Sequence, residues 1–326
     1  MTVDEYKATV EDVLGNCTFR DCDSLEYRRS ILQRLDFGEL PIRLFQYRSV
    51  SDEMIEGLKW GILRFKSPTR FNDPYDSLMR WDSAEISNLL NNPKYAHILA
   101  KHNIFDEDTL AASIKGRFRI SCFSEVSDSP VMWAHYAKNG GGFCVEYELG
   151  ACIGCPLCLK NGQPCSEGRD PTCDPRTCGY FSKATLAPVI YDSRHQDTTL
   201  AMKQQILFAC AKELGEQCCL GEYDWLEPYK TTLIKSEDWA YEKEWRYILS
   251  DLQLRGDQDW QYPYDRIVRV ILGAKMNPLE EYKVTKAVEE YARNVKRNVV
   301  LAKAYVDVQS SDYRLSIKHE RTISGS

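Results

Sequence analysis

The sequence predicts an α+β protein with a mixed, mostly antiparallel sheet that is flanked by helices. Short stretches rich in β-branched and aromatic residues recur along the chain, and segments with helical spacing of apolar residues separate them. Glycine or proline stands at many of the junctions. The expected strands are residues 43–48, 63–67, 118–124, 143–148, 189–191, 245–249, 268–272 and 299–306.

We expect one main domain with extensions. Residues 1–40 have apolar positions at helical spacing in two segments and are expected to form an N-terminal helical extension. Residues 41–310 are expected to form a single α+β domain, with an inserted Cys-rich module at residues 151–179. Residues 311–326 are expected to be a C-terminal tail, since chain ends are usually frayed.

The first part of the main domain alternates short strands with helices and loops. Ser51 and the acidic residues after it predict the start of a short helix behind the strand at 43–48. The polar sequence FNDPYD follows the second strand. It forms either an Asx-type turn before a helix or a loop that contributes Asn72 and Asp73 to a site. Residues 80–116 are expected to be mostly helical.

A short helix and a glycine turn are expected between the strands at 118–124 and 143–148. The sequence VMWAHYAKN predicts the helix, and three successive glycines follow it at residues 140–142. Glycines leave the backbone free to approach a ligand or to turn at positive φ. Further along the chain, a helix is expected at 198–220 and an amphipathic helix before the last strand at 299–306.

The composition is that of an ordinary globular protein. The chain has 326 residues, of which 43% are hydrophobic and 28% charged, so it is long enough for a large core. The net charge of −6 excludes a global positive field for binding nucleic acid, although a local basic groove remains allowed. No secretory signal pattern is visible at the N-terminus, and no apolar run approaches the roughly 20 residues that span a bilayer. We therefore expect a cytoplasmic protein without a membrane partner.

The Cys-rich module differs from the rest of the sequence. Of the 13 cysteines, those between Cys152 and Cys178 form a cluster in a segment rich in Pro, Gly and Asp. Clustered cysteines in a reducing compartment favour a metal site, and four thiolates suit a structural Zn²⁺. Disulfides and a redox role are the alternatives, and Cys152 or Cys165 could replace one of the ligands. The predicted zinc ligands are Cys155, Cys158, Cys173 and Cys178.

The sequence WAYEKEWRY is a candidate wall of a polar cleft. In a β-strand, alternate side chains share one face, so Glu242, Glu244 and Arg246 would point to one side. Trp245 and Tyr247 would point to the other side. The alternative is a surface strand whose charged side chains are solvated or paired, since charged residues are usually exposed.

Several sequence blocks occur in a fixed order: YR after the first strand, SPTRFNDPYDS, CFSE followed by MWAHYAKNGGGFCVEY, and YEKEWR. Together they resemble a bacterial family known as domain of unknown function 2971, over about residues 43–275. The family name implies no activity. The Cys-rich module lies between two family-like strands, so we expect it to be an insertion.

The order of the blocks is also similar to the ADP-ribosyltransferase superfamily, in particular the branch that modifies nucleic acids. This resemblance implies an early-strand basic residue that holds NAD, an aromatic block near the nicotinamide and a glutamate on a late strand. The implied catalytic residues are Glu244, Tyr136 and His135. The alternative is that His135 is a core or capping residue and that Trp133 belongs to the core. The implied NAD-binding residues are Arg43, Tyr47, Arg48, Asn72, Asp73, Trp133 and Arg246.

Three functions are compatible with the sequence. The first is an NAD-consuming ADP-ribosyltransferase or glycohydrolase, of the kind found among toxin and phage-defence effectors, with a nucleic acid or a protein as acceptor. Its Glu244 would stabilise the positive charge that develops as nicotinamide leaves. The second is a nuclease that binds Mg²⁺ through Asp73, Asp76, Glu242 and Glu244. The third is a non-enzymatic module that binds a nucleotide or a partner and carries a structural zinc site.

Overall fold

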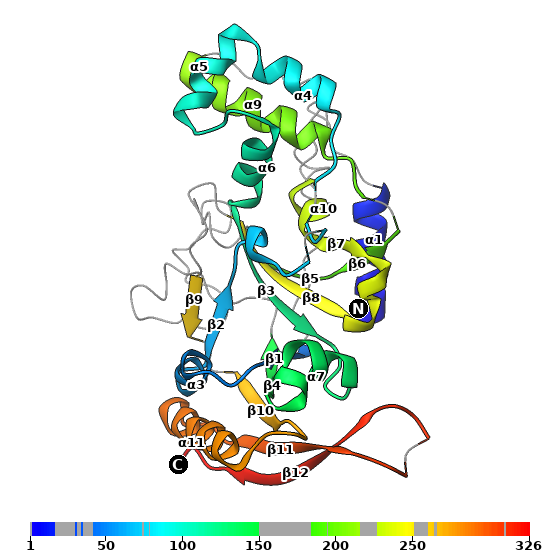
Figure 1. The fold of residues 1–326 in the computed structure, drawn as a ribbon, viewed down its shortest axis with the longest axis vertical. Coiled ribbons are helices and arrows are strands. Elements are labelled where there is room, and N and C mark those ends of the chain that lie inside the picture. Colours follow the sequence, from blue (N-terminus) through cyan, green and yellow to red (C-terminus); the bar gives the residue numbers. More distant parts are fainter. Residues whose placement is uncertain are drawn as a thin grey trace.

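The structure is a computed structural model, shown in Figure 1. It describes residues 2–16, 30, 34, 42–73, 75–77, 79–149, 184–193, 195–215, 227–250, 260–263, 266–309 and 311–326. The Cys-rich module lies outside the described residues, as does most of the second expected N-terminal helical segment. The zinc site at Cys155, Cys158, Cys173 and Cys178 therefore stays a prediction.

The main element is an eight-stranded sheet with the strand order β12-β11-β10-β4-β1-β3-β8-β5. Its neighbouring strands pair antiparallel except for β10 and β11, which are parallel. The predicted α+β class with a mixed, mostly antiparallel sheet is thus confirmed. The strands are β1 (Ile42–Arg48), β3 (Phe118–Ser124), β4 (Phe143–Leu149), β5 (Ala184–Pro188), β8 (Glu244–Ser250), β10 (Ile267–Leu272), β11 (Val299–Val306) and β12 (Leu315–Ile323).

Two small sheets complete the described strands. An antiparallel pair joins β2 (Ile62–Phe65) to β9 (Trp260–Pro263), and a parallel pair joins β6 (Ile190–Asp192) to β7 (Ile234–Ser236). The sequence predicts one strand at 189–191, but the chain makes two. It leaves β8 after Val189, whose N–H still donates to the carbonyl of Glu244 at 2.9 Å, and then pairs with β7.

Helices gather at both ends of the molecule (Figure 1). In that view α4, α5, α6 and α9 lie at one end, whereas α3 and α11 lie side by side at the other, next to β10, β11 and β12. The α-helices are α1 (Val3–Asn16), α3 (Asp52–Lys59), α4 (Ser83–Leu90), α5 (Pro93–Lys101), α6 (Glu107–Lys115), α7 (Pro130–Tyr136), α9 (Thr199–Leu214), α10 (Glu227–Leu233) and α11 (Pro278–Val295). Short 3-10 helices are η1 (Pro68–Arg70), η2 (Lys138–Gly140) and η5 (Glu237–Glu242). Within the described residues, no helix combines the length and the apolarity needed to cross a membrane.

Local sequence explains where the helices begin. Ser51 is the N-cap of α3, as expected, and its hydroxyl accepts a hydrogen bond from the backbone N–H of Met54. Ser129 caps α7 in the same way and is followed by Pro130 at the first helical position, where no N–H is needed. These two caps fix where α3 begins after β1 and where α7 begins after β3.

Apolar side chains fill both faces of the main sheet. Leu44 of β1 and Val145 of β4 belong to the larger core, while Phe45 and Cys144 belong to a second cluster that includes Trp133 of α7. Because alternate strand residues point to opposite faces, the two clusters lie on opposite sides of the sheet. Both sides of the central strands are therefore covered.

The N-terminal helix α1 joins the larger core. Tyr6 stacks on Trp245 with ring centroids 6.0 Å apart, and its hydroxyl donates to the carbonyl of Leu186 at 3.2 Å. Residues Tyr6, Val10 and Val13 of this helix are fully buried. The helical spacing of apolar residues that predicts α1 thus also identifies the face of α1 that packs on the larger core.

The end of the chain differs from the expected tail. Residues of β12 pair antiparallel with β11 along its whole length. Most side chains of β12 are exposed, so its sequence LSIKHERTI lacks the apolar alternation of a core strand. Backbone pairing at the sheet edge, which leaves no strong mark in the sequence, makes this strand.

The three successive glycines form a tight turn between α7 and β4. Gly140 has a φ of +85°, and a Cβ atom on Gly142 would collide with the carbonyl oxygen of Arg48. Of the two expected uses of these glycines, the structure supports the turn and the close packing against β1.

Candidate functional site

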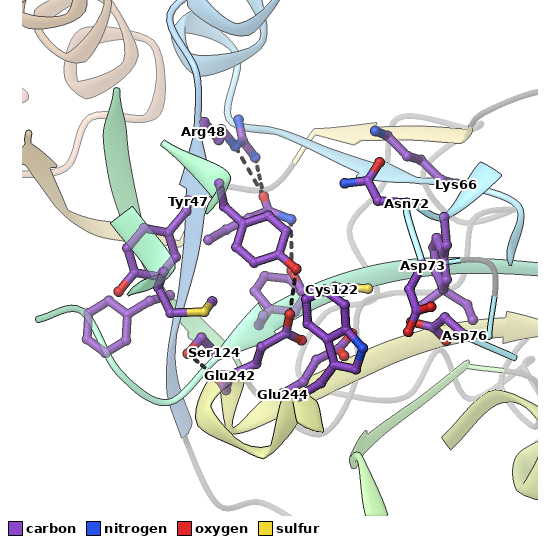
Figure 2. A pocket seen from close by; sticks show the side chains of 18 of the residues that line it. Tyr47, Arg48, Lys66, Asn72, Asp73, Asp76, Cys122, Ser124, Glu242 and Glu244 are labelled. Atoms are coloured by element: carbon purple, nitrogen blue, oxygen red, sulfur yellow. Dashed lines mark hydrogen bonds between the residues drawn. The ribbon is translucent and has the colours of Figure 1, made fainter. Parts of the chain in front are cut away.

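A cavity of about 270 Å³ lies where β1, β3 and β8 meet η1, α7 and η5 (Figure 2). Its lining comes from segments far apart in the chain, from Phe45 to Glu244. Small-molecule sites typically span about 300–1,000 Å³. A cavity of about 270 Å³ is thus slightly below this range.

The cavity brings together six of the ten residues predicted to be catalytic or to bind NAD. In Figure 2, Arg48 lies at the top of the view and Glu242 and Glu244 lie at the bottom. Asn72 and Asp73 lie at the right. The predicted catalytic or NAD-binding residues that line it are Tyr47, Arg48, Asn72, Asp73, Tyr136 and Glu244.

Three of the predicted NAD-binding residues, Arg43, Trp133 and Arg246, do not line the cavity. The side chain of Arg43 is 62% exposed and lies 3.6 Å from a carboxylate oxygen of Glu146 and 3.8 Å from one of Glu148. Trp133 is buried in the second core cluster, where its Nε1–H donates to the carbonyl of Ser127 at 2.8 Å. Trp133 is therefore a core residue, which is the alternative that its sequence left open.

His135 and Arg246 also lie outside the cavity lining. His135 is exposed, and its Nδ1 is 3.0 Å from the hydroxyl oxygen of Tyr241, close to the ring of Trp239. Arg246 is fully buried behind Glu244. It contacts the cavity lining through the carboxylates of Asp76 and Glu244 and through the ring of Phe71, whose centroid lies 5.3 Å from its guanidinium.

A buried ionic network occupies the acidic side of the cavity. It consists of Asp76, Lys235, Glu242, Glu244 and Arg246, none more than 7% exposed. Lys235 Nζ donates to Glu242 Oε2 at 2.7 Å and to Glu244 Oε2 at 3.0 Å. Arg246 donates through Nε to Glu244 Oε1 at 2.8 Å and through Nη2 to Asp76 Oδ2 at 2.6 Å. Every carboxylate of the network thus has a cationic partner.

A sharp turn places the two glutamates side by side. Glu242 ends η5 and Glu244 begins β8, with Lys243 between them at a left-handed φ of 44°. Ser124 holds this turn by donating from its hydroxyl to the carbonyl of Glu242 at 2.6 Å. The prediction that Glu242, Glu244 and Arg246 share the face of one strand is therefore wrong for Glu242. The three side chains nevertheless meet, because Lys235 bridges the two glutamates.

The network separates the pKa values of its two glutamates. Burial alone would raise the pKa of Glu244, but Arg246 and Lys235 outweigh it and lower that pKa to about 2. Burial, together with the charge of Glu244, raises the pKa of Glu242 above that of an ordinary glutamate. Neighbouring carboxylates with such divergent pKa values are typical of acid–base sites.

Tyr136 connects α7 to the network. Its hydroxyl donates to Glu242 Oε1 at 2.5 Å. Burial and this hydrogen bond raise the pKa of Tyr136, so the phenol stays protonated and remains a donor. Both oxygens of Glu242 are thus fixed, one by Tyr136 and one by Lys235.

The opposite side of the cavity is a cationic wall formed by Arg48, Arg64, Lys66 and Arg70. Arg48 is 6% exposed, and its Nη2 donates to the hydroxyl of Tyr147 at 2.6 Å. The same guanidinium forms no ion pair with any carboxylate in the described part of the chain. Arg48 therefore carries a buried positive charge that those residues do not neutralise.

Apolar and aromatic side chains lie between the two charged sides. They come from β1, β3, α7, η5 and the loop after η1. Tyr47 is fixed by its hydroxyl, which donates to the carbonyl of Val126 at 2.7 Å, and its ring meets Trp133 edge to face with centroids 5.3 Å apart. The main apolar residues of the lining are Phe45, Tyr47, Phe71, Phe123, Met132 and Trp239.

The Mg²⁺ site of the nuclease hypothesis has no counterpart in the described residues. No group of three or more histidine, cysteine, aspartate or glutamate residues among them is arranged to hold a metal ion. Of the predicted ligands, Asp76, Glu242 and Glu244 bind Lys235 or Arg246 instead. These cations occupy the positions that a metal ion would take.

The sequence did not reveal several lining residues. Lys235 lies in a short strand whose pairing with β6 is long-range, and only its closeness to the EKE sequence could have drawn attention to it. Arg64 alternates with the buried Leu63 and Phe65, which is a usable sign that it faces the other way. Trp239 reaches the lining because η5 precedes Glu242.

Comparison with known proteins identifies a family for part of the chain. No curated protein and no solved structure matches it. Residues 132–247 match the family described as "Protein of unknown function (DUF2971)". This segment contains Tyr136, Lys235, Glu242, Glu244 and Arg246, so most of the acidic side of the cavity comes from it. The predicted resemblance to this family is confirmed over residues 132–247.

Proposed function

We propose that this protein is an NAD-consuming enzyme. It cleaves the bond between nicotinamide and ribose and passes the ADP-ribose to water or to an acceptor. The observation that carries the proposal is the convergence of Arg48, Tyr136, Glu242 and Glu244 on one cavity. NAD has anionic phosphates at its centre and a positively charged nicotinamide ring at one end, and the two sides of the cavity match this distribution of charge.

Each part of NAD has a complementary surface. The guanidinium of Arg48 suits phosphate oxygens through its planar fork. Tyr136 and Trp239 offer aromatic rings beside the carboxylates, where a planar nicotinamide can stack. The paired glutamates then lie next to the ribose carbon that carries nicotinamide.

The reaction requires negative charge at the ribose and a group that takes up a proton. As the bond from ribose C1′ to the nicotinamide nitrogen breaks, its electron pair goes to nicotinamide, which leaves as a neutral molecule. The ribose becomes positively charged, and a preorganised carboxylate stabilises that state best in a closed site. The incoming oxygen or nitrogen atom then bonds to C1′ and loses its proton.

The two glutamates suit these two tasks. Glu244, whose pKa is about 2, stays ionised and supplies the fixed negative charge. Glu242, whose pKa is raised, accepts the proton of the incoming nucleophile. Lys235 holds the two carboxylates next to each other by donating to both, and Arg246 donates to Glu244.

The test is the release of nicotinamide from NAD, measured with and without added nucleic acid or protein. We expect release by the wild type and a loss of about 100-fold or more in Glu242→Gln and in Glu244→Gln, since general base and electrostatic contributions are of that order. Glu237→Gln is the matched control, because Glu237 is an exposed glutamate on the same 3-10 helix and should leave the rate unchanged. No release under any of these conditions, or equal release by all variants, would contradict the proposal.

A further inference from the structure

Two buried N–H groups in the cationic wall have no acceptor among the described residues. Arg48 Nη1 and Arg64 Nε are both inaccessible to solvent, and neither has a hydrogen-bond partner within the part of the chain that the structure describes. Both residues line the cavity. Buried donors are nearly always paired in folded proteins, so an unpaired pair in a cavity wall indicates a missing acceptor.

Protein groups fix the orientation of Arg48. Its Nη2 donates to Gln46 Oε1 at 2.5 Å, to the hydroxyl of Tyr147 at 2.6 Å and to the carbonyl of Ile62 at 3.2 Å. Its Nε donates to Gln46 Oε1 at 3.2 Å. Nη1 is thus the one nitrogen of this guanidinium that the described residues leave without a partner.

Arg64 is held in a similar manner from the side of α3. Its Nη1 forms an ion pair with Glu53, and its Nη2 donates to the carbonyl of Glu53 at 3.1 Å. Its Nε has no hydrogen-bond partner among the residues that the structure describes. Groups held in place before a ligand arrives lose little entropy when they bind it, so these contacts prepare the wall for an anion.

The charges of the wall extend from the enclosed part toward solvent. Arg64 and Lys66 are two residues apart along β2 and its continuation, so they project from the same face at a spacing of roughly 6.6 Å along the strand. Lys66 and Arg70 are exposed, whereas Arg48 is buried. The wall thus offers cations at two depths, with Arg48 enclosed and Lys66 and Arg70 at the open side.

We propose that the cationic wall is a binding site for a diphosphate group. Arg48 and Arg64 hold the enclosed phosphate, and Lys66 and Arg70 hold the second phosphate at the open side of the cavity. The ligand class is therefore a nucleoside diphosphate or a dinucleotide, not a nucleoside or a monophosphate. This inference rests on the proposed function and deepens it, since it names the part of NAD that the wall recognises.

The test uses inorganic pyrophosphate and inorganic phosphate as probes on the full chain, by titration calorimetry and by the shift in Tm. We expect pyrophosphate to raise Tm and to bind at least tenfold more tightly than phosphate. Arg48→Met should weaken pyrophosphate binding by about 30-fold, as expected for a buried charge that contacts an anion. Lys66→Met should weaken it about threefold, since Lys66 is exposed. Lys101→Met, which removes an exposed lysine on α5, is the control and should change nothing.

A second variant keeps the test informative if Arg48→Met does not fold. The double variant Lys66→Met/Arg70→Met changes two exposed side chains and should reduce the preference for pyrophosphate over phosphate to less than threefold. Equal affinity for the two probes in the wild type, or unchanged pyrophosphate affinity in the double variant, would overturn the diphosphate site.

The outcomes for this site and for the enzyme activity are separable. Nicotinamide release without any binding of pyrophosphate would overturn the diphosphate site and leave the proposed function intact. Binding of pyrophosphate that is lost in Arg48→Met, without nicotinamide release, would support the site and contradict the proposed function.

Discussion

The two charged sides of the cavity are built in opposite ways. In the buried ionic network, Glu242, Glu244 and Asp76 each bind Lys235 or Arg246, and Arg246 has acceptors on Nε, Nη1 and Nη2. In the cationic wall, Arg48 is almost as deeply buried but lacks a carboxylate partner in the described chain and keeps Nη1 unpaired. One side is complete without a ligand and the other is not.

This difference separates fold stability from ligand binding. A paired network loses several kcal/mol when one partner is removed, because an uncompensated buried charge remains. An arginine that contacts only neutral acceptors leaves no charge behind when it is removed. The network is therefore expected to determine stability, and the wall is expected to determine affinity for an anion.

The largest expected effect is that of Arg246→Met. This change leaves the buried Asp76 and Glu244 with Lys235 as their only cation in the network, and we expect a loss of about 3–5 kcal/mol in the free energy of unfolding. Urea unfolding followed by circular dichroism measures it. Arg43→Met is the control, since its exposed ion pairs should contribute less than about 1 kcal/mol. Equal losses of unfolding free energy in the two variants would contradict the role of the buried ionic network in stability.

The next effect concerns pH. The pKa of Glu244 is about 2 in the fold and 4.5 as the ordinary value, so its ionised form adds about 3 kcal/mol of stability above pH 5. That contribution falls as the pH drops toward 2, with about half of it lost between pH 5 and 3. Glu242 acts in the opposite direction, since its raised pKa removes stability as the pH rises above 4.5.

Unfolding of Glu244→Gln measured beside the wild type isolates the Glu244 contribution. The difference in unfolding free energy between the two proteins should shrink as the pH falls from 5 to 3. A difference that stays constant over this range would show that Glu244 has an ordinary pKa in the fold.

A smaller effect is expected for Arg48→Met. It removes hydrogen bonds to Gln46, Tyr147 and Ile62 but strands no buried carboxylate, so the loss should be about 1–2 kcal/mol. The same urea titration measures it. A loss as large as that of Arg246→Met would mean that the two sides of the cavity are built alike.

The smallest effect is expected for Lys66→Met. Lys66 is exposed and forms no ion pair with another described residue, so its replacement should change the unfolding free energy by less than about 0.5 kcal/mol. The affinity of the Lys66→Met variant for pyrophosphate should nevertheless fall. A variant that changes binding and leaves stability unchanged sharpens the distinction between the wall and the network.

Local sequence predicts most of the strands, because β-branched and aromatic residues gather in short stretches that glycine or proline separates. The strand expected at 299–306 agrees with β11, and those at 118–124 and 43–48 agree within a residue. The edge strand β12 escapes this reasoning, since its side chains are exposed and only its backbone is paired.

The site could be predicted only in part. Arg43 and Arg48 lie on the same strand at odd spacing, so they point to opposite faces. Both faces of this strand mix polar and apolar residues, and the sequence gives no reason to choose one of the two arginines. Lys235 and Arg64 reach the cavity through long-range strand pairing, which local patterns do not encode.

The central claim is that both sides of the cavity act on one NAD molecule. Its most direct test is to measure NAD binding by calorimetry and single-turnover nicotinamide release on the same preparations of wild type and Glu242→Gln. We predict that Glu242→Gln binds NAD within about threefold of the wild type but releases nicotinamide at least about 100-fold more slowly. Release at the wild-type rate by Glu242→Gln, or a wild type that does not bind NAD, would contradict the account.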